Sequence, residues 1–190
     1  NLPRIALESE GDMNKFWEIF NERMNIAEDA LVYRVERTKE ATPANAPILY
    51  QYGAFGRRLG KDESVDQLFK NRRATVSLGY IGLYEVATVF FGNSWEHNPE
   101  AKEFTLAIIR DMKRRVEEWS DQYGYHFSIY STPSESLTDR FCRLDTEKFG
   151  SIPDITDKEY YTNSFHYDVR KNPTPFEKLD FEKAYPEAGA

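Results

Sequence analysis

The fold is decided at residues 126–136, where a strand-like run passes directly into a helix start: His126-Phe127-Ser128-Ile129-Tyr130-Ser131-Thr132-Pro133-Ser134-Glu135-Ser136. Residues 126–130 are a candidate strand. Thr132 is followed three residues later by Glu135, which predicts a capping box, and Pro133 falls at the first helical position. We therefore expect a helix that begins near residue 133 and continues to about residue 149.

The same order of strand, turn and helix occurs earlier in the chain. Residues 74–82 form a β-rich run that ends in two glycines, Gly79 and Gly82, and a helical pattern covers residues 83–91. Asn98 and Pro99 then open a long amphipathic helix that Gly124 ends. Strands and helices in alternation predict an α/β fold with parallel neighbouring strands. Ligands in such sheets bind beyond the carboxyl ends of the strands, so the turns at 79–82 and 131–136 are candidate sites.

The rest of the pattern predicts a single partial domain over residues 1–190, because no repeat or Pro/Gly/Ser linker divides it. We expect an amphipathic helix at 13–38, a short helix near 65–69 and a short strand or loop at 48–50. Residues 160–169 are expected to form another strand, and the tail is expected to be mostly loop. Both ends read as cut from a longer protein.

Composition excludes several classes of protein. The 190 residues are 40% hydrophobic, which is too apolar for a disordered chain, and a net charge of -7 argues against a nucleic-acid binder. The single cysteine, Cys142, excludes an internal disulfide and a multi-cysteine zinc site within these residues. No apolar run reaches 18 residues and no signal-peptide pattern opens the chain, so we expect a cytoplasmic protein without a membrane span.

The turn at 131–136 has two interpretations. A helix N-terminus presents free backbone N–H groups and a partial positive charge, and Ser134 and Ser136 add hydroxyl donors, so the turn could hold a phosphate or another oxyanion. A capping box between Thr132 and Glu135 needs no ligand and explains the same residues.

The turn at 79–82 is similarly open to two interpretations. Its glycines could let the backbone approach a ligand, with Tyr80 projecting into the pocket, or they could form a plain tight turn. Cys142 lies on the apolar side of the predicted helix at 133–149, which favours a packed small residue over a nucleophile.

Several segments, in the same order along nearly the whole chain, resemble the anaerobic (class III, glycyl-radical) ribonucleoside-triphosphate reductases. The segments are Asn1-Leu2-Pro3-Arg4-Ile5-Ala6-Leu7-Glu8, Ala46-Pro47-Ile48-Leu49-Tyr50, Ser77-Leu78-Gly79-Tyr80-Ile81-Gly82, Ser128–Leu137, Asp139–Asp145, Thr156-Asp157-Lys158, Tyr160–His166 and Phe176-Glu177-Lys178.

This resemblance implies that the chain is part of the second half of a ten-stranded α/β barrel. The family reduces ribonucleoside triphosphates to deoxyribonucleoside triphosphates: a glycyl radical generates a cysteine thiyl radical, and formate commonly supplies the electrons. The resemblance also implies a homodimeric parent, a radical-SAM activase that makes the glycyl radical and a structural zinc. None of these cofactors is expected to bind within these residues.

Residue by residue, the turn at 132–136 resembles the loop that holds the substrate phosphates, with Thr132, Ser134 and Ser136 as binding residues. Glu135 resembles a carboxylate close to the ribose, a role that conflicts with its place in a capping box. Tyr80 resembles a residue that lines the same pocket, and the glycines of its turn, Gly79 and Gly82, are expected to bind substrate as well. Asn1 resembles an active-site asparagine and is expected to be poorly ordered at the chain end.

The sequence also departs from the family pattern. It has no segment that resembles the radical-bearing glycine motif, and Cys142 does not match the thiyl cysteine. We therefore expect no reductase activity from the isolated chain. Two other readings remain open: a stand-alone nucleotide- or phosphate-binding module, and a structural fragment with no function outside its parent.

Overall fold

The computed structural model describes residues 1–71, 73–131 and 134–190, with the side chain of Glu135 left out. Most of the regular structure is helical. In chain order the elements are α1 (Leu2–Glu8), α2 (Met13–Lys39), the 3-10 turn Pro43–Asn45, α3 (Pro47–Tyr50), the 3-10 turn Val65–Leu68, β1 (Thr75–Gly79), α4 (Leu83–Phe91), the 3-10 turn Trp95–His97, α5 (Pro99–Tyr123), β2 (His126–Tyr130), α6 (Glu135–Phe149), the 3-10 turn Val169–Lys171, α7 (Pro175–Glu182) and α8 (Ala184–Ala188).

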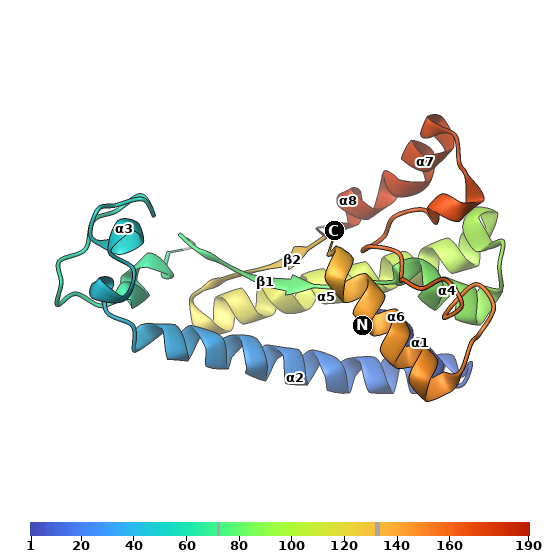
Figure 1. Cartoon of the computed structure of the whole chain (residues 1–190), viewed down its shortest axis with the longest axis horizontal. Helices are drawn as coiled ribbons and strands as arrows, with labels where there is room; N and C mark the ends of the chain where they lie inside the picture. The colour runs from blue at the N-terminus through green and yellow to red at the C-terminus, as the bar shows by residue number, and fades with distance from the viewer. Residues whose placement is uncertain (72, 132–133) are drawn as a thin grey trace. The chain divides into compact units, whose positions relative to one another are not determined.

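The two strands form one sheet and run parallel, as their arrows in Figure 1 show. At their amino ends, Thr75 Oγ1 lies 3.3 Å from His126 Nδ1. At their carboxyl ends, a Cβ on Gly79 would lie 3.8 Å from the carbonyl oxygen of Tyr130. The α/β alternation that the sequence predicts is therefore present, and both strands deliver their following turns to the same edge.

The described chain divides into two compact units. The first comprises Asn1–Glu22, Gly79–Arg114 and Ile129–Ala190, and the second comprises Arg23–Leu78 and Arg115–Ser128. The first unit contains a core cluster of Ile81, Cys142, Ile155 and Tyr161, and the second contains one of Leu59, Val65 and Leu68. Whether both belong to one partial domain of a larger protein stays a prediction.

Within the first unit, α1 packs against α4 because a glycine allows the approach. Gly82 is the N-cap of α4 with φ +82, and a Cβ there would lie 2.2 Å from Cγ of Pro3. The backbone N–H of Leu2 donates to the carbonyl of Ile81 over 3.2 Å. These contacts place residue 1 beside the turn that follows β1.

Several sequence expectations are confirmed within a residue or two, including the helices at 13–39 and 83–91 and the strand at 126–130. The Asn98 cap is also confirmed, since its Oδ1 accepts the N–H of Glu100 over 2.9 Å. Residues 48–50 belong to α3 instead of a strand or plain loop, because Pro47 starts a short helical turn there.

Two expectations about the last third of the chain are wrong. Residues 160–169 do not form a strand: positive φ at Glu159 and Ser164 breaks the extended backbone, leaving one isolated bridge between Asn163 and Ile81. The tail is not mostly loop, because Thr174 and Glu177 form a capping box that starts α7, and α8 follows.

Candidate functional site

The turns after the two strands meet in one cavity of the first unit. The cavity has a volume of about 420 Å³ and is lined by Asn1, Gly79, Tyr80, Ile81, Tyr130, Ser134, Leu137 and Phe141. Four residues that the sequence singled out are therefore brought together although they come from three distant segments: Asn1, Gly79, Tyr80 and Ser134.

The start of α6 forms one side of this cavity. Ser134 is the N-cap, and its carbonyl accepts the N–H groups of Leu137 and Thr138, each over 3.0 Å. The Ser134 side chain makes no capping hydrogen bond, so its hydroxyl is not committed to the helix. A helix N-terminus attracts anions through its first N–H groups and its dipole. The cavity therefore has an anion-friendly end at α6.

Tyr80 also lines the cavity and is only 4% exposed. The Oγ of Ser131 donates to the Tyr80 hydroxyl oxygen over 2.9 Å. Burial raises the pKa of Tyr80 well above its ordinary value, although the hydrogen bond from Ser131 acts against this shift. Tyr80 is therefore a neutral phenol at physiological pH, and its own proton can be donated to a ligand.

Asn1 is held by two hydrogen bonds, so the expectation that it is poorly ordered is wrong. Its Oδ1 accepts the backbone N–H of Arg4 over 3.2 Å and caps α1. Its Nδ2 donates to Oδ2 of Asp145 over 3.1 Å. The capping role fixes the amide at the cavity wall.

The other predicted site residues lie elsewhere or outside the described residues. Gly82 is not among the lining residues, and packing explains why this position is a glycine, because a Cβ there would meet Pro3 at 2.2 Å. Ser136 is exposed on the first turn of α6 and is not among the lining residues. Thr132 and the Glu135 side chain lie outside what the structure describes, so their roles stay predictions.

Sequence reasoning missed the apolar wall of the cavity, formed by Ile81, Tyr130, Leu137 and Phe141. Two of these large side chains are partly open to solvent: Tyr130, at the end of β2, is 53% exposed, and Leu137, on α6, is 37% exposed. Leu137 and Phe141 are four residues apart on α6 and therefore share a face. That spacing was the available signal once the helix start had been placed.

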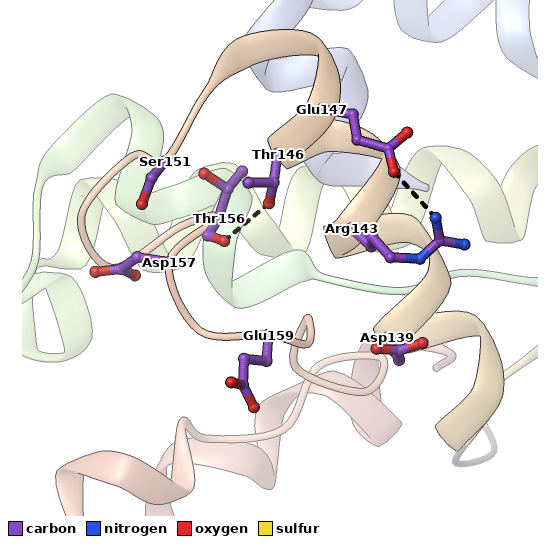
Figure 2. A pocket seen from close by; sticks show the side chains of 8 residues that line it. All are labelled: Asp139, Arg143, Thr146, Glu147, Ser151, Thr156, Asp157 and Glu159. Atoms are coloured by element: carbon purple, nitrogen blue, oxygen red, sulfur yellow. Dashed lines mark hydrogen bonds and ion pairs between the residues drawn. The ribbon is translucent and has the colours of Figure 1, made fainter.

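A second, larger cavity of about 530 Å³ lies along α6 and the segment after it, as Figure 2 shows. Its polar lining carries four carboxylates against one guanidinium, that of Arg143, which already pairs with Glu147 over 3.0 Å. A triphosphate would be repelled by this balance of charge. The anion-friendly start of α6 makes the smaller cavity the better candidate for a nucleotide.

Cys142 is a packed residue, as the sequence predicts. It is fully buried among Ile81, Ile155 and Tyr161, and its Sγ donates to the carbonyl of Thr156 over 3.5 Å. Burial raises the pKa of the thiol to about 11, with a smaller opposing effect from Thr146. The thiol is therefore protonated at neutral pH and is a poor nucleophile.

Among the side chains that the structure describes, no group of three or more His, Cys, Asp or Glu residues could hold a metal ion. No helix in the described part of the chain is both long and apolar enough to cross a membrane.

The fold and the cavity define an α/β fragment with a candidate anion site at the carboxyl ends of parallel strands. Residues 1–189 match the family described as anaerobic ribonucleoside-triphosphate reductase, and the chain belongs to this family. The family assignment that the sequence motifs suggested is confirmed.

Individual relatives agree. The chain is 50% identical over 189 residues to the anaerobic ribonucleoside-triphosphate reductase of Salmonella typhimurium, covering 98% of this chain and 26% of that protein. It is 47% identical over 189 residues to the enzyme of the same name from Enterobacteria phage T4, covering 97% of this chain and 30% of the phage protein. The chain thus spans between a quarter and a third of the length of these relatives.

The chain is also similar to the crystal structure of the anaerobic ribonucleotide reductase from Thermotoga maritima with glycerol in the active site. The TM-score is 0.77 at 22% identity, covering 100% of this chain and 29% of that chain. This likeness confirms the expected fold class, an α/β fragment of the reductase fold.

Proposed function

We propose that the 420 Å³ cavity is part of the substrate pocket of an anaerobic ribonucleoside-triphosphate reductase. The observation that carries the proposal is the convergence of Asn1, Tyr80 and Ser134 on one cavity, because each was singled out from a different stretch of sequence. The family membership supplies the substrate class, a ribonucleoside triphosphate.

The start of α6 is the proposed place for the phosphates. Its partial positive charge and the uncommitted hydroxyl of Ser134 suit a group of several negative oxygens. The proposal keeps Thr132 and Ser136 as additional phosphate contacts and Glu135 as a carboxylate near the ribose. The second cavity is disfavoured by its excess of carboxylates.

The walls suit the uncharged part of a nucleotide. The exposed ring of Tyr130 and the side chains of Leu137 and Phe141 provide apolar surface for a base or sugar face. The neutral phenol of Tyr80 and the amide of Asn1 provide hydrogen-bond donors for ribose oxygens.

Catalysis would depend on the rest of the parent protein. The glycyl radical, when present, supplies the one-electron chemistry, and formate, a structural zinc, a homodimer partner and a radical-SAM activase complete the proposed system. The deoxyribonucleotide products would serve DNA synthesis, and the proposed location of the parent is the cytoplasm. The isolated chain is proposed to be inactive, because it has no radical glycine motif.

Binding of nucleotide to the full-length protein tests the pocket. We compare Ser134→Ala and Tyr80→Phe, which alter the smaller cavity, with Arg143→Ala, which removes the guanidinium of the larger one. The first two variants should weaken equilibrium binding of a ribonucleoside triphosphate about 5- to 10-fold, the size expected for one lost hydrogen bond. Arg143→Ala should bind as the wild type does.

The opposite pattern would reject the proposal: unchanged binding in Ser134→Ala and Tyr80→Phe, with loss in Arg143→Ala, would move the site to the larger cavity. Tight binding by the isolated chain would instead favour a stand-alone nucleotide-binding module. Ser134→Ala is a fair probe, because the side chain makes no capping hydrogen bond whose loss would destabilise α6.

Cys142 provides a separate check on the chemistry. Because its thiol is buried and protonated, Cys142→Ala in the full-length, activated protein should keep deoxyribonucleotide formation within about twofold. A loss of a thousandfold or more with normal nucleotide binding would assign this cysteine to the radical chemistry and contradict the proposal.

A further inference from the structure

A fully buried carboxylate lies directly behind the cavity wall. Asp145 on α6 has a side-chain exposure of 0%. Its Oδ1 accepts from the guanidinium of Arg4 on α1, and its Oδ2 accepts from the hydroxyl of Tyr161 over 2.7 Å and from Nδ2 of Asn1 over 3.1 Å. One buried charge is thus matched by three donors from two separate segments of the first unit, Asn1 and Arg4 from the first and Tyr161 from the last.

These contacts determine which way the amide of Asn1 faces. Its Oδ1 accepts the backbone N–H of Arg4, and one Nδ2 hydrogen is donated to Asp145. If the amide were reversed, its Nδ2 would face the backbone N–H of Arg4, which is also a donor. Its Oδ1 would face the carboxylate of Asp145, which is also an acceptor. The amide oxygen is therefore committed, and the remaining free group is the second Nδ2 hydrogen.

We propose that Asp145 is a positioning residue that fixes the Asn1 amide so that a single N–H donor, and no acceptor, is available to the cavity. This inference rests on the proposed function of the cavity. It adds that the Asn1 amide acts there only as a hydrogen-bond donor. The partner of such a donor is an oxygen lone pair, which a ribose hydroxyl or a small carboxylate would supply.

A purely structural role for Asp145 is the competing explanation, and the chain offers a matched control for it. Lys148 on α6 pairs with Glu8 on α1 over 2.5 Å, so this ion pair joins the same two helices without contacting Asn1. If the link between α6 and α1 were what mattered for activity, Lys148→Ala would also lower it.

The test is a set of variants of the full-length, activated protein, with kcat and KM for a ribonucleoside triphosphate measured separately. Asp145→Asn presents an amide to Asn1, which favours the reversed Asn1 amide. We expect kcat to fall about tenfold or more, as for removal of one placed donor. KM should stay within about twofold, because the phosphates are held at α6, and Lys148→Ala should leave both constants unchanged.

A double-mutant cycle separates positioning from folding. Asn1→Ser keeps a capping oxygen but removes the amide donor, and adding Asp145→Asn to it should change kcat by less than about twofold. The proposal would be overturned if the double variant lost kcat by the product of the two single losses. It would also be overturned if Lys148→Ala lowered kcat as much as Asp145→Asn does. Failure of the pocket itself would be seen separately, as unchanged nucleotide binding in Ser134→Ala and Tyr80→Phe.

A polarity swap covers the case in which Asp145→Asn does not fold. The double variant Asn1→Asp with Asp145→Asn keeps one carboxylate and one amide in contact and keeps an oxygen at the α1 cap, so it should fold. Residue 1 would then offer the cavity no N–H, and kcat should stay at least about tenfold below wild type. A swap variant with wild-type kcat would show that no donor is needed there.

Discussion

The backbone N–H of Ser134 donates to Oδ1 of Asn163 over 2.8 Å. Asn163 also forms the isolated bridge to Ile81, so one residue of the segment after α6 contacts both turns that border the cavity. The acceptor at the start of α6 is a neutral amide oxygen. The positive end of the helix dipole is therefore left without a neutralising charge at this contact.

Asn163→Asp should weaken nucleotide binding without unfolding the site. The carboxylate has the same shape and still accepts the Ser134 N–H, but it adds a negative charge where the phosphates are proposed to lie. At roughly 6 Å and an effective dielectric constant of about 20, the repulsion is about 3 kcal/mol per unit charge. We expect at least a tenfold rise in the dissociation constant for a ribonucleoside triphosphate, measured by calorimetry on the full-length protein.

Asn98→Asp is the matched control, because it makes the same change at the N-cap of α5. Asn98 accepts the N–H of Glu100, and it does not line the cavity. Both variants should gain a few tenths of a kcal/mol to about 1 kcal/mol from the helix dipole. Equal nucleotide affinity in the two variants would argue that the phosphates do not lie at the start of α6.

Gly82→Ala should be far more destabilising than Gly124→Ala. Both glycines have a positive φ, +82 and +72, so both variants carry a backbone penalty of about 1 kcal/mol. Only at Gly82 would the new Cβ meet Pro3, at 2.2 Å, whereas nothing lies within 4 Å at Gly124. The thermal midpoints of the two full-length variants should therefore differ clearly, and equal midpoints would contradict the close packing of α1 on α4.

Local signals explain most of what the sequence could predict. Asn98 with Pro99 located the start of α5, and the runs at 75–79 and 126–130 located both strands. The same reasoning was available for α7, since Thr174-Pro175-Phe176-Glu177 repeats the Thr-Pro-x-Glu spacing of Thr132–Glu135. The prediction of a loop overlooked this motif, which can be recognised without any tertiary contact.

The contacts that complete the cavity could not be predicted in this way. Asn163 reaches Ser134 across 29 residues, and Asp145 reaches Asn1 across 144 residues. Segment 160–169 looked like a strand by composition, yet its course is fixed by hydrogen bonds to residues 81–83 and by positive φ at Ser164. Tertiary contacts therefore override local propensity in that segment.

Lys158→Met should loosen the segment at 158–168, which contacts both turns of the cavity through Asn163. The Lys158 ammonium is fully buried, pairs with Glu85 and lies 3.2 Å from Asp168. Removing it leaves two buried carboxylates without their shared cation, which costs about 3–5 kcal/mol. Hydrogen exchange in the full-length protein should speed up at the N–H of Thr162, which donates to Glu85 over 2.9 Å.

The control for this variant is Lys183→Met, which breaks the exposed pair with Asp180. Exposed pairs contribute about 0–1 kcal/mol, so exchange at Thr162 should not change in this variant. Suppose that the Thr162 N–H exchanged no faster in the Lys158→Met variant than in the Lys183→Met variant. That result would show that the buried cluster does not hold residues 158–168 in place.

Lys102 should titrate near physiological pH. Its ammonium lies 3.8 Å from the ring centre of Tyr185 and 4.3 Å from that of Phe181. Burial lowers the pKa of Lys102 to about 8, partly opposed by the charges of Asp180 and Glu182. In the unfolded chain a lysine has a pKa of about 10.4.

Between these two pKa values the unfolded chain binds more protons than the folded one, so the contribution of Lys102 to stability should rise as the pH increases from about 8 to about 10. Competitive acylation of the full-length protein, followed by mass spectrometry, should give Lys102 a titration midpoint near pH 8. Lys183 is the reference, because its hydrogen bond to Asp180 raises its pKa. A Lys102 midpoint at or above that of Lys183 would show that the carbonyl of Phe181 and the two rings stabilise the ammonium more than burial disfavours it.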